Sequence, residues 1–150
     1  MPKSIIIETN GGPEVLELKD VKVGTPGPDE IKVTNHAIGL NYIDTYHRSG
    51  LYPLKLPSGI GLEAAGKVDE VGSNVKEFNI GDNVAYASIP LGAYSQQRII
   101  PSKIVVKVPE GISHKQAATL MTKGLTTNYL LCKTYQLKAG ETVLFHAAAG

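Results

Sequence analysis

The 150-residue chain has little cysteine and no excess of charge, and both absences limit what it can be. Its single cysteine, Cys132, has no partner for a disulfide within the chain, which favours a reducing compartment such as the cytoplasm. Lys and Arg together number 15 against 14 Asp and Glu, and no basic block stands out. A nucleic-acid binder needs concentrated positive charge, so we expect no nucleic-acid partner.

Long apolar runs are also missing. The amino-terminal stretch MPKSIIIETN has only three consecutive isoleucines before a charged residue, too few for the apolar core of a signal peptide. No other stretch approaches the roughly 20 apolar residues that cross a membrane as a helix. We therefore expect a soluble, cytoplasmic protein with no membrane partner.

The chain is rich in turn-forming residues, and its 16 glycines and 9 prolines separate short apolar segments. Alternation of apolar and polar residues predicts strands, and it is clear in EIKVTNHAIG, where Ile31 and Val33 alternate with Lys32 and Thr34. Further strands are expected at Ser4–Glu8 and within GKVDEVG, GDNVAYA, GAYSQQRIIP and KIVVKVP. Many short strands with closely spaced turn signals predict a small barrel or sandwich.

The pattern changes to a helix near Ser113. This serine is a good N-cap, and Gln116 three residues later completes a capping box. Helical faces are suggested by Ala117, Leu120, Met121, Leu125, Leu130 and Leu131. Gly124 is expected to interrupt or kink the helix, and Cys132 to be a small core residue on its apolar face.

The last segment, TVLFHAAAG, reads as a strand that enters a turn of small residues. A strand, small residues and a helix together bind the pyrophosphate of a dinucleotide, and Ala148 and Gly150 could be the first two small positions. A buried strand ending in a tight turn explains the same letters, and on these residues alone it is favoured. Thr142–Phe145 is expected to be a core strand of a parallel sheet, which other parts of the chain or a second copy must cover unless it is disordered.

Several motifs together resemble the zinc-independent quinone oxidoreductases of the medium-chain dehydrogenase/reductase superfamily. They are GGPEVLEL, AIGLNYIDTYHRSGLY, GLEAAGKVDEVG, GDNVAYA, LGAYS, KGLTTNYLL and FHAAAG, in order along essentially the whole chain. The resemblance implies a mainly β fold with some α, a GroES-like barrel followed by the truncated start of a Rossmann α/β domain. The barrel is expected over residues 1–122, with a linking helix and the first Rossmann strand over residues 123–150.

The residues also argue against zinc. Zinc-dependent relatives use a C-x-x-D and a G-H-E segment, and here Asn41 and Leu62 stand in place of the cysteine and the histidine. An amide is a weak zinc ligand and leucine is none. One cysteine is too few for a structural zinc lobe, so we predict that no metal is bound. The histidines lack close ligand spacing and are expected to be ordinary surface or hydrogen-bonded residues: His36, His47, His114 and His146.

The resemblance implies an NADPH-dependent enzyme that transfers a hydride to a quinone or another electrophilic small molecule without a metal, with NADH as an alternative cofactor. The negative charge that reaches a quinone oxygen then needs a hydrogen-bond donor. The predicted catalytic residues are Asn41, Tyr46 and Tyr52, with Asn41 and Tyr46 in the polarising and orienting roles. Tyrosine, whose ordinary pKa is about 10, is a donor here more than a titrating group.

The family pattern also implies a cofactor-lining stretch. The predicted cofactor-binding residues are Tyr42, Ile43, Asp44, Thr45, Tyr46, Thr126, Tyr129 and Gly150. If residues 41–49 are helical, Asn41 and Thr45 share one face, and Tyr42 and Tyr46 share the next. Spacing alone favours a plain amphipathic helix with tyrosines against the barrel. Asp44 could likewise be an exposed helix charge, and Glu63 is expected to make structural hydrogen bonds to the backbone.

Two other functions stay open. An enone or alkene reductase would share hydride delivery but accept it at carbon, and a non-catalytic GroES-like module would bind a partner only. The resemblance implies a homodimer for the full-length protein. We expect the 150 residues alone to bind nucleotide poorly and to be inactive.

Overall fold

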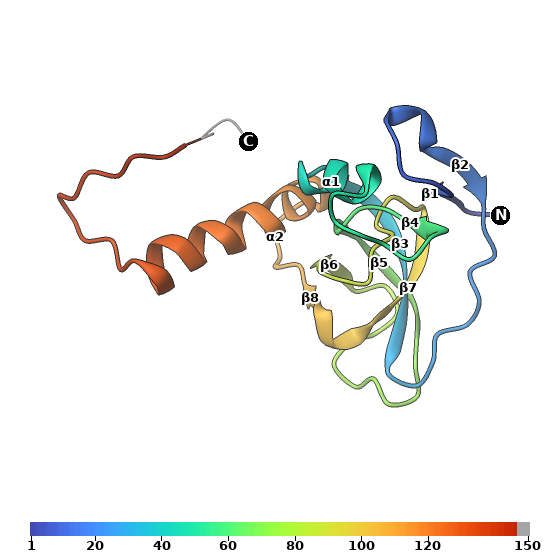
Figure 1. The fold of residues 1–150 in the computed structure, drawn as a ribbon. Helices are drawn as coiled ribbons and strands as arrows, with labels where there is room; N and C mark the ends of the chain where they lie inside the picture. Colours follow the sequence, from blue (N-terminus) through green and yellow to red (C-terminus); the bar gives the residue numbers. More distant parts are fainter. Residues whose placement is uncertain (147–150) are drawn as a thin grey trace.

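The computed structural model describes residues 1–146, and these contain two antiparallel sheets (Figure 1). The larger sheet has the order β7-β3-β5-β6-β8, with β3 at Glu30–Gly39, β5 at Glu63–Val71, β6 at Asn83–Ala87, β7 at Gln97–Pro101 and β8 at Val105–Lys107. The smaller has the order β2-β1-β4, with β1 at Lys3–Ile7, β2 at Glu17–Asp20 and β4 at Ser58–Gly59. The predicted mainly β fold is confirmed.

The five-stranded sheet curls around one core, because every one of its strands contributes to the same buried cluster. Ile31 and Val33 of β3 meet Val68 of β5, Tyr86 of β6 and Ile100 of β7 there. The alternation read from EIKVTNHAIG is thus the alternation of a strand with one face in the core. Register shifts in the pairing of β3 with β5 mark β-bulges, which bend a strand and assist such curling.

The helices lie against this sheet and beside its end. Short 3₁₀ turns occupy Pro13–Val15 (η1) and Ser102–Ile104 (η2), and α1 spans Ile43–Ser49. The long helix α2 spans His114–Asn128 and begins at the predicted capping box, with the Gln116 backbone N–H donating to Ser113 Oγ at 3.3 Å. Its first turns dock through small residues, since Ala117 and Ala118 pack on Ala65 and Ala85 of the sheet.

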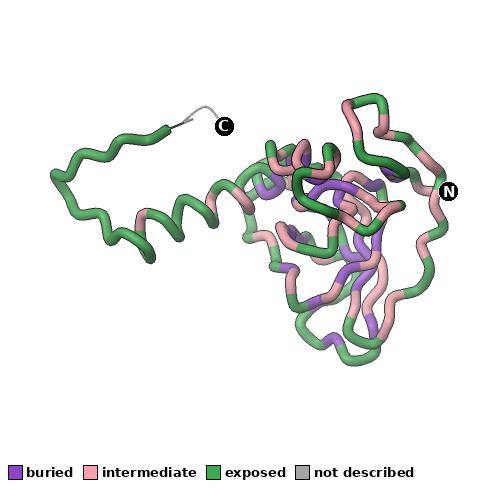
Figure 2. Tube along the Cα trace, in the orientation of Figure 1, coloured by how far each residue is buried: buried purple, intermediate pink, exposed green. Residues whose placement is uncertain are grey.

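Beyond those turns the chain forms an arm, residues 124–146, which projects from the sheets (Figures 1 and 2). The predicted interruption at Gly124 is wrong, because α2 continues to Asn128 and only then passes into a π-helix, η3, at Tyr129–Thr134. Cys132 is exposed, so its assignment to the core is also wrong. The helical apolar pattern is present in the arm, but no described element packs over Cys132.

The strand expected at Thr142–Phe145 is absent from the described structure. The segment is in no sheet, and Leu144 is 81% exposed. A strand needs a neighbour's N–H and C=O groups, and none of the strands within residues 1–146 offers them to this segment. Ala148 and Gly150 lie outside the described residues. The predicted domain boundary after residue 122 falls within α2 and remains a prediction.

None of the helices in residues 1–146 combines the length and the apolar character that a membrane span needs.

Candidate active site

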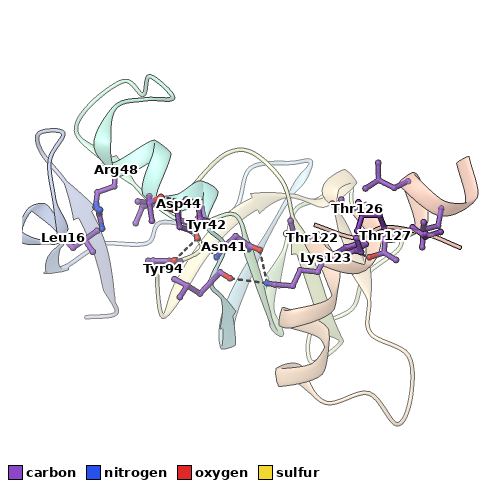
Figure 3. A pocket seen from close by; sticks show the side chains of 18 residues that line it. Leu16, Asn41, Tyr42, Asp44, Arg48, Tyr94, Thr122, Lys123, Thr126 and Thr127 are labelled. Atoms are coloured by element: carbon purple, nitrogen blue, oxygen red, sulfur yellow. Dashed lines mark hydrogen bonds between the residues drawn. The ribbon is translucent and has the colours of Figure 1, made fainter. Parts of the chain in front are cut away.

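A cavity of about 870 Å³ opens where α1, the loop before it and the arm meet (Figure 3). It is lined by Leu16, Leu40, Asn41, Tyr42, Asp44, Thr45, Arg48, Ile60, Tyr94, Thr122, Lys123, Thr126, Thr127, Leu130, Leu131, Val143, Leu144 and Phe145. Eight of these side chains are aliphatic or phenylalanine, two are tyrosines, and the other eight are polar or charged. That composition is typical of a site for a small organic molecule.

Glu63 ties the cavity wall to the sheet. It is fully buried at the start of β5, and its Oε2 accepts a hydrogen bond of 2.7 Å from Asn41 Nδ2. Its Oε1 accepts one of 2.7 Å from the backbone N–H of Thr122 on α2. The expected structural hydrogen bond to backbone is therefore confirmed, and the bond to Asn41 is an addition. One carboxylate thus links the loop before α1 to the helix α2.

Glycine at position 39 allows these parts to approach. A Cβ there would lie 2.2 Å from the Ala118 carbonyl oxygen and 2.6 Å from Glu63 Oε2. Because Gly39 has no side chain, α2 can lie directly against the end of β3 and Glu63 can reach the loop.

The buried Asp44 pairs with the half-buried Tyr94. Asp44 is 4% exposed, so the alternative of an exposed helix charge is wrong. Its Oδ2 accepts hydrogen bonds from the Asn41 backbone N–H at 3.0 Å and from Tyr94 Oη at 2.8 Å. Burial, and then the hydrogen bond and the charge of Asp44, raise the pKa of the Tyr94 phenol, so it remains protonated. Asp44 Oδ1 is buried and has no hydrogen-bond partner.

Lys123 brings a positive charge to the cavity. Its Nζ donates to the Leu40 carbonyl oxygen at 3.3 Å and to Asn41 Oδ1 at 3.2 Å. Both polar atoms of the Asn41 side chain are thus engaged, because the nitrogen donates to Glu63 and the oxygen accepts from Lys123, the second contact being visible in Figure 3. The orientation of this amide is fixed twice.

The predicted residues divide into two groups. Asn41, Tyr42, Asp44, Thr45 and Thr126 line the cavity together. The cavity lining does not include Ile43, Tyr46, Tyr52 or Tyr129, and Gly150 lies outside the described residues.

The tyrosines of the NYIDTYHRSGLY motif form a row of rings. The Tyr42 and Tyr46 ring centroids are 5.4 Å apart, as their helical spacing predicts, and those of Tyr46 and Tyr52 are 5.3 Å apart. Tyr42 is 72% exposed, so this ring is not packed into the barrel as spacing alone suggested. The row leads from the cavity wall at Tyr42 to its outside.

Within residues 1–146 no group of three or more His, Cys, Asp or Glu side chains is arranged to hold a metal ion. His114 Nε2 lies 3.0 Å from Asn83 Oδ1, and its ring centroid lies 4.7 Å from that of His36, a proximity that sequence spacing did not indicate. His47 departs from the expected surface or hydrogen-bonded role, since it is buried and its Nδ1 has no partner.

Sequence reasoning missed several cavity residues. Tyr94 lies in the LGAYS motif, which supported the resemblance without being assigned to the site, and Lys123 precedes the glycine of KGLTTNYLL. Their partners are 50 and 82 residues away along the chain, so only the fold reveals the contacts.

The fold and site define a class by comparison with known proteins. Residues 27–110 match the family model described as "Alcohol dehydrogenase GroES-like domain". The match covers more than half of the chain, and the chain belongs to that family. The predicted GroES-like fold is confirmed.

Individual relatives narrow the class. The "Quinone oxidoreductase" of Pseudomonas aeruginosa is 58% identical over 100% of this chain and 46% of its own length. A "2-haloacrylate reductase" of Burkholderia sp. is 44% identical over 100% of this chain and 47% of its own length. The chain thus spans about half the length of the curated relatives it matches.

Solved structures agree. A quinone oxidoreductase of Pseudomonas syringae pv. tomato superposes with a TM-score of 0.96 at 56% identity, over 100% of this chain and 46% of that one. The Escherichia coli quinone oxidoreductase complexed with NADPH superposes with a TM-score of 0.91 at 50% identity, over 93% of this chain and 43% of that one. The resemblance to quinone oxidoreductases is confirmed.

Proposed function

We propose that this chain forms the N-terminal part of an NADPH-dependent quinone oxidoreductase that works without a metal. The observation that carries the proposal is the cavity, which gathers five of the predicted site residues from the α1 region and α2: Asn41, Tyr42, Asp44, Thr45 and Thr126. Their positions along the chain differ by up to 85 residues, and they meet in one place. The similarity to a structure complexed with NADPH supports the choice of cofactor.

The residues present fit the nicotinamide end of this cofactor. Asp44 Oδ1 and Thr122 Oγ1 are buried without hydrogen-bond partners, and both residues line the cavity. A carboxamide and a ribose offer both donors and acceptors, which would satisfy a carboxylate oxygen and a hydroxyl. Tyr42, just before α1, and Thr45 on α1 would hold the same end, as would Thr126 from α2. Gly150, outside the described residues, remains our candidate for the phosphate end.

The cofactor supplies a hydride, so that NADPH, a quinone and one proton give NADP⁺ and a hydroquinone. The chain's own residues bind and orient the two reactants. Asn41 Nδ2 has two hydrogens, of which Glu63 accepts one, and the other is available to a ligand oxygen. Tyr46 and Tyr52 extend the row of rings from Tyr42, which supports a role in holding a flat acceptor beside the cavity.

The chemistry of Asn41 supports the metal-free mechanism. A cation at Asn41 Oδ1 would compete with the ammonium of Lys123, which already donates to that oxygen. Leu62, where zinc-dependent relatives have histidine, offers no lone pair. The cytoplasmic location and the homodimer are further parts of this proposal, the first supported by the single cysteine.

A second candidate function is the reduction of an electron-poor alkene. It is favoured by the 44% identity to a relative named "2-haloacrylate reductase". Hydride delivery would be the same, but the acceptor atom would be the alkene carbon one bond removed from the carboxylate-bearing carbon, and the carboxylate-bearing carbon would then take a proton.

The test is NADPH oxidation by the full-length protein with 1,4-benzoquinone or 2-chloroacrylate as acceptor, with and without a chelator. Quinone-dependent turnover that survives chelation supports the proposal, and turnover with 2-chloroacrylate alone selects the second function. Asn41→Ala is expected to lower kcat at least about tenfold by removing a positioned donor. The matched control is Asn128→Ala, an exposed asparagine of α2 outside the cavity lining, which should leave kcat unchanged.

A further inference from the structure

Two cationic side chains line the cavity, and they lie apart in Figure 3. Arg48 lies near Leu16 and donates through Nε to the Gly11 carbonyl oxygen at 3.2 Å. Lys123 lies beside Asn41, the residue predicted to polarise the acceptor. The charge that could act on the reacting end of a ligand is therefore Lys123.

The ammonium of Lys123 is held by two hydrogen bonds and keeps one further N–H donor. Two acceptors, the Leu40 carbonyl oxygen at 3.3 Å and Asn41 Oδ1 at 3.2 Å, take two of its three N–H donors. The third N–H is left for a ligand. A flexible lysine that is fixed by two acceptors loses part of its rotamer freedom before any ligand arrives, which lowers the cost of using it.

Glu63 orients both Asn41 and the part of α2 that carries Lys123. Its Oε2 accepts from Asn41 Nδ2 at 2.7 Å, so the amide must turn its oxygen toward Lys123. Its other oxygen accepts the Thr122 backbone N–H at 2.7 Å, which fixes the helix one residue before Lys123. The buried carboxylate thus orients both the acceptor atom and the helix that presents the ammonium.

We propose that Lys123 is a further catalytic residue, whose ammonium stabilises the anionic oxygen that hydride arrival leaves on the acceptor, and that Glu63 is its positioning residue through Asn41. The inference deepens the proposed function and rests on it. The hydride carries two electrons to the quinone and leaves a hydroquinone monoanion, which then takes a proton from solvent. Lys123 keeps its own proton throughout and acts by charge and hydrogen bonding.

The first experiment compares variants of the full-length protein in quinone reduction. Lys123→Met keeps the chain length and removes the charge, and we expect kcat to fall roughly 10- to 100-fold, at or below the effect of losing one oxyanion donor. Lys123→Arg should recover part of the loss. Lys115→Met, an exposed lysine of α2 outside the cavity lining, is the matched control and should leave kcat unchanged.

The second experiment needs neither cofactor nor turnover. 4-Nitrophenolate mimics the anionic oxygen and 4-nitroanisole is its neutral counterpart, and the binding of both to the full-length protein can be titrated. Wild type and Lys115→Met should prefer the anion, and Lys123→Met should lose that preference while binding the neutral probe as before. If the role of Lys123 were purely structural, Lys123→Met would weaken the binding of both probes together, and that result would overturn the proposal.

Glu63→Gln separates positioning from charge. Glutamine can return a donor to Asn41, so the asparagine amide turns its nitrogen toward Lys123 and displaces the ammonium. We expect Glu63→Gln to lose at least about half as much of the anion preference as Lys123→Met loses. An unchanged preference would overturn the positioning role. If wild type shows the Lys123-dependent anion preference but reduces no quinone, the proposed function fails while the anion site stands.

Discussion

The five-stranded sheet and the arm have similar shares of apolar residues but bury them very differently (Figure 2). In the sheet Ile31 and Tyr86 are 0% exposed, whereas in the arm Leu125 is 58% exposed and Leu144 81%. The sheet finds its packing partners within the described chain, and the arm does not. Burial of apolar surface is the dominant stabilising term in folding, so the stability of residues 1–146 must come mainly from the sheets and the first turns of α2.

The candidate site lies where these two regions meet. Glu63 on β5 and Asp44 on α1 are buried, and Thr126, Leu130 and Phe145 line the cavity from the arm. A site needs positions held to within a fraction of an ångström, which the sheet side provides. The arm provides a wall with few contacts of its own, which suits a surface completed by a ligand.

The largest expected contrast is between two apolar truncations. Ile31→Ala leaves a cavity in the core and should lower the free energy of unfolding of the 150-residue chain by about 2–5 kcal/mol. Leu125→Ala removes an exposed side chain and should change it by less than about 0.5 kcal/mol. Urea denaturation followed by circular dichroism measures both. Equal effects would show that the arm is packed in solution.

Two glycines give a smaller contrast of opposite sign. Gly39→Ala places a Cβ 2.2 Å from the Ala118 carbonyl oxygen, so α2 must move, and we expect a loss of about 1–3 kcal/mol, the usual cost of overpacking. Gly124→Ala meets only Leu120 Cβ at 4.0 Å within a helix, and should gain about 0.5–1 kcal/mol. The same denaturation series measures the pair. A destabilising Gly124→Ala would mean that the helix does not pass through this residue unbroken.

The smallest effect is a pH dependence at the start of α2. Burial, and then the nearby charges of His36 and Lys67, lower the pKa of His114 despite an opposing hydrogen bond with the Gly66 backbone. The unfolded chain then binds the proton more readily, so this stability is present above the ordinary histidine pKa of about 6.5 and is lost as pH falls through the folded value. His114→Asn should flatten the unfolding free energy across that acidic window.

The matched control for this prediction is His146→Asn in the arm, where the histidine is exposed. It should leave the pH profile as it is in the wild type. A His114→Asn profile identical to wild type would remove His114 from the account of acid sensitivity.

Local patterns predicted those parts of the fold that depend on local contacts. The alternation of Ile31 and Val33 gave a strand, and the spacing of Ser113 and Gln116 gave the start of α2. The predictions of a core position for Cys132 and of a core strand at Thr142–Phe145 were wrong. An apolar pattern shows that a face can be buried, but it does not show that a neighbour covers it. The predicted interruption of the helix at Gly124 was wrong because one glycine costs a helix only about 1 kcal/mol, which its neighbours in α2 offset.

The site was also predictable in part, namely where its residues are close together in the sequence. The NYIDTYHRSGLY motif identified Asn41, Tyr42, Asp44 and Thr45 because they lie close together in sequence and share a short helical region. Tyr94 and Lys123 reach the same cavity from other elements, and only the packing of α2 on the sheet brings Lys123 to Asn41. A lysine on an exposed helix turn carries no sequence signal for such a contact.

The most direct test of the account is hydrogen exchange of the full-length protein with and without NADPH. We expect slower exchange at residues 41–46 and 122–127, where residues of the α1 region and of α2 line the cavity, and no change at residues 72–82, a loop region outside it. Protection confined to residues outside 41–46 and 122–127 would contradict the assignment of this cavity to the cofactor.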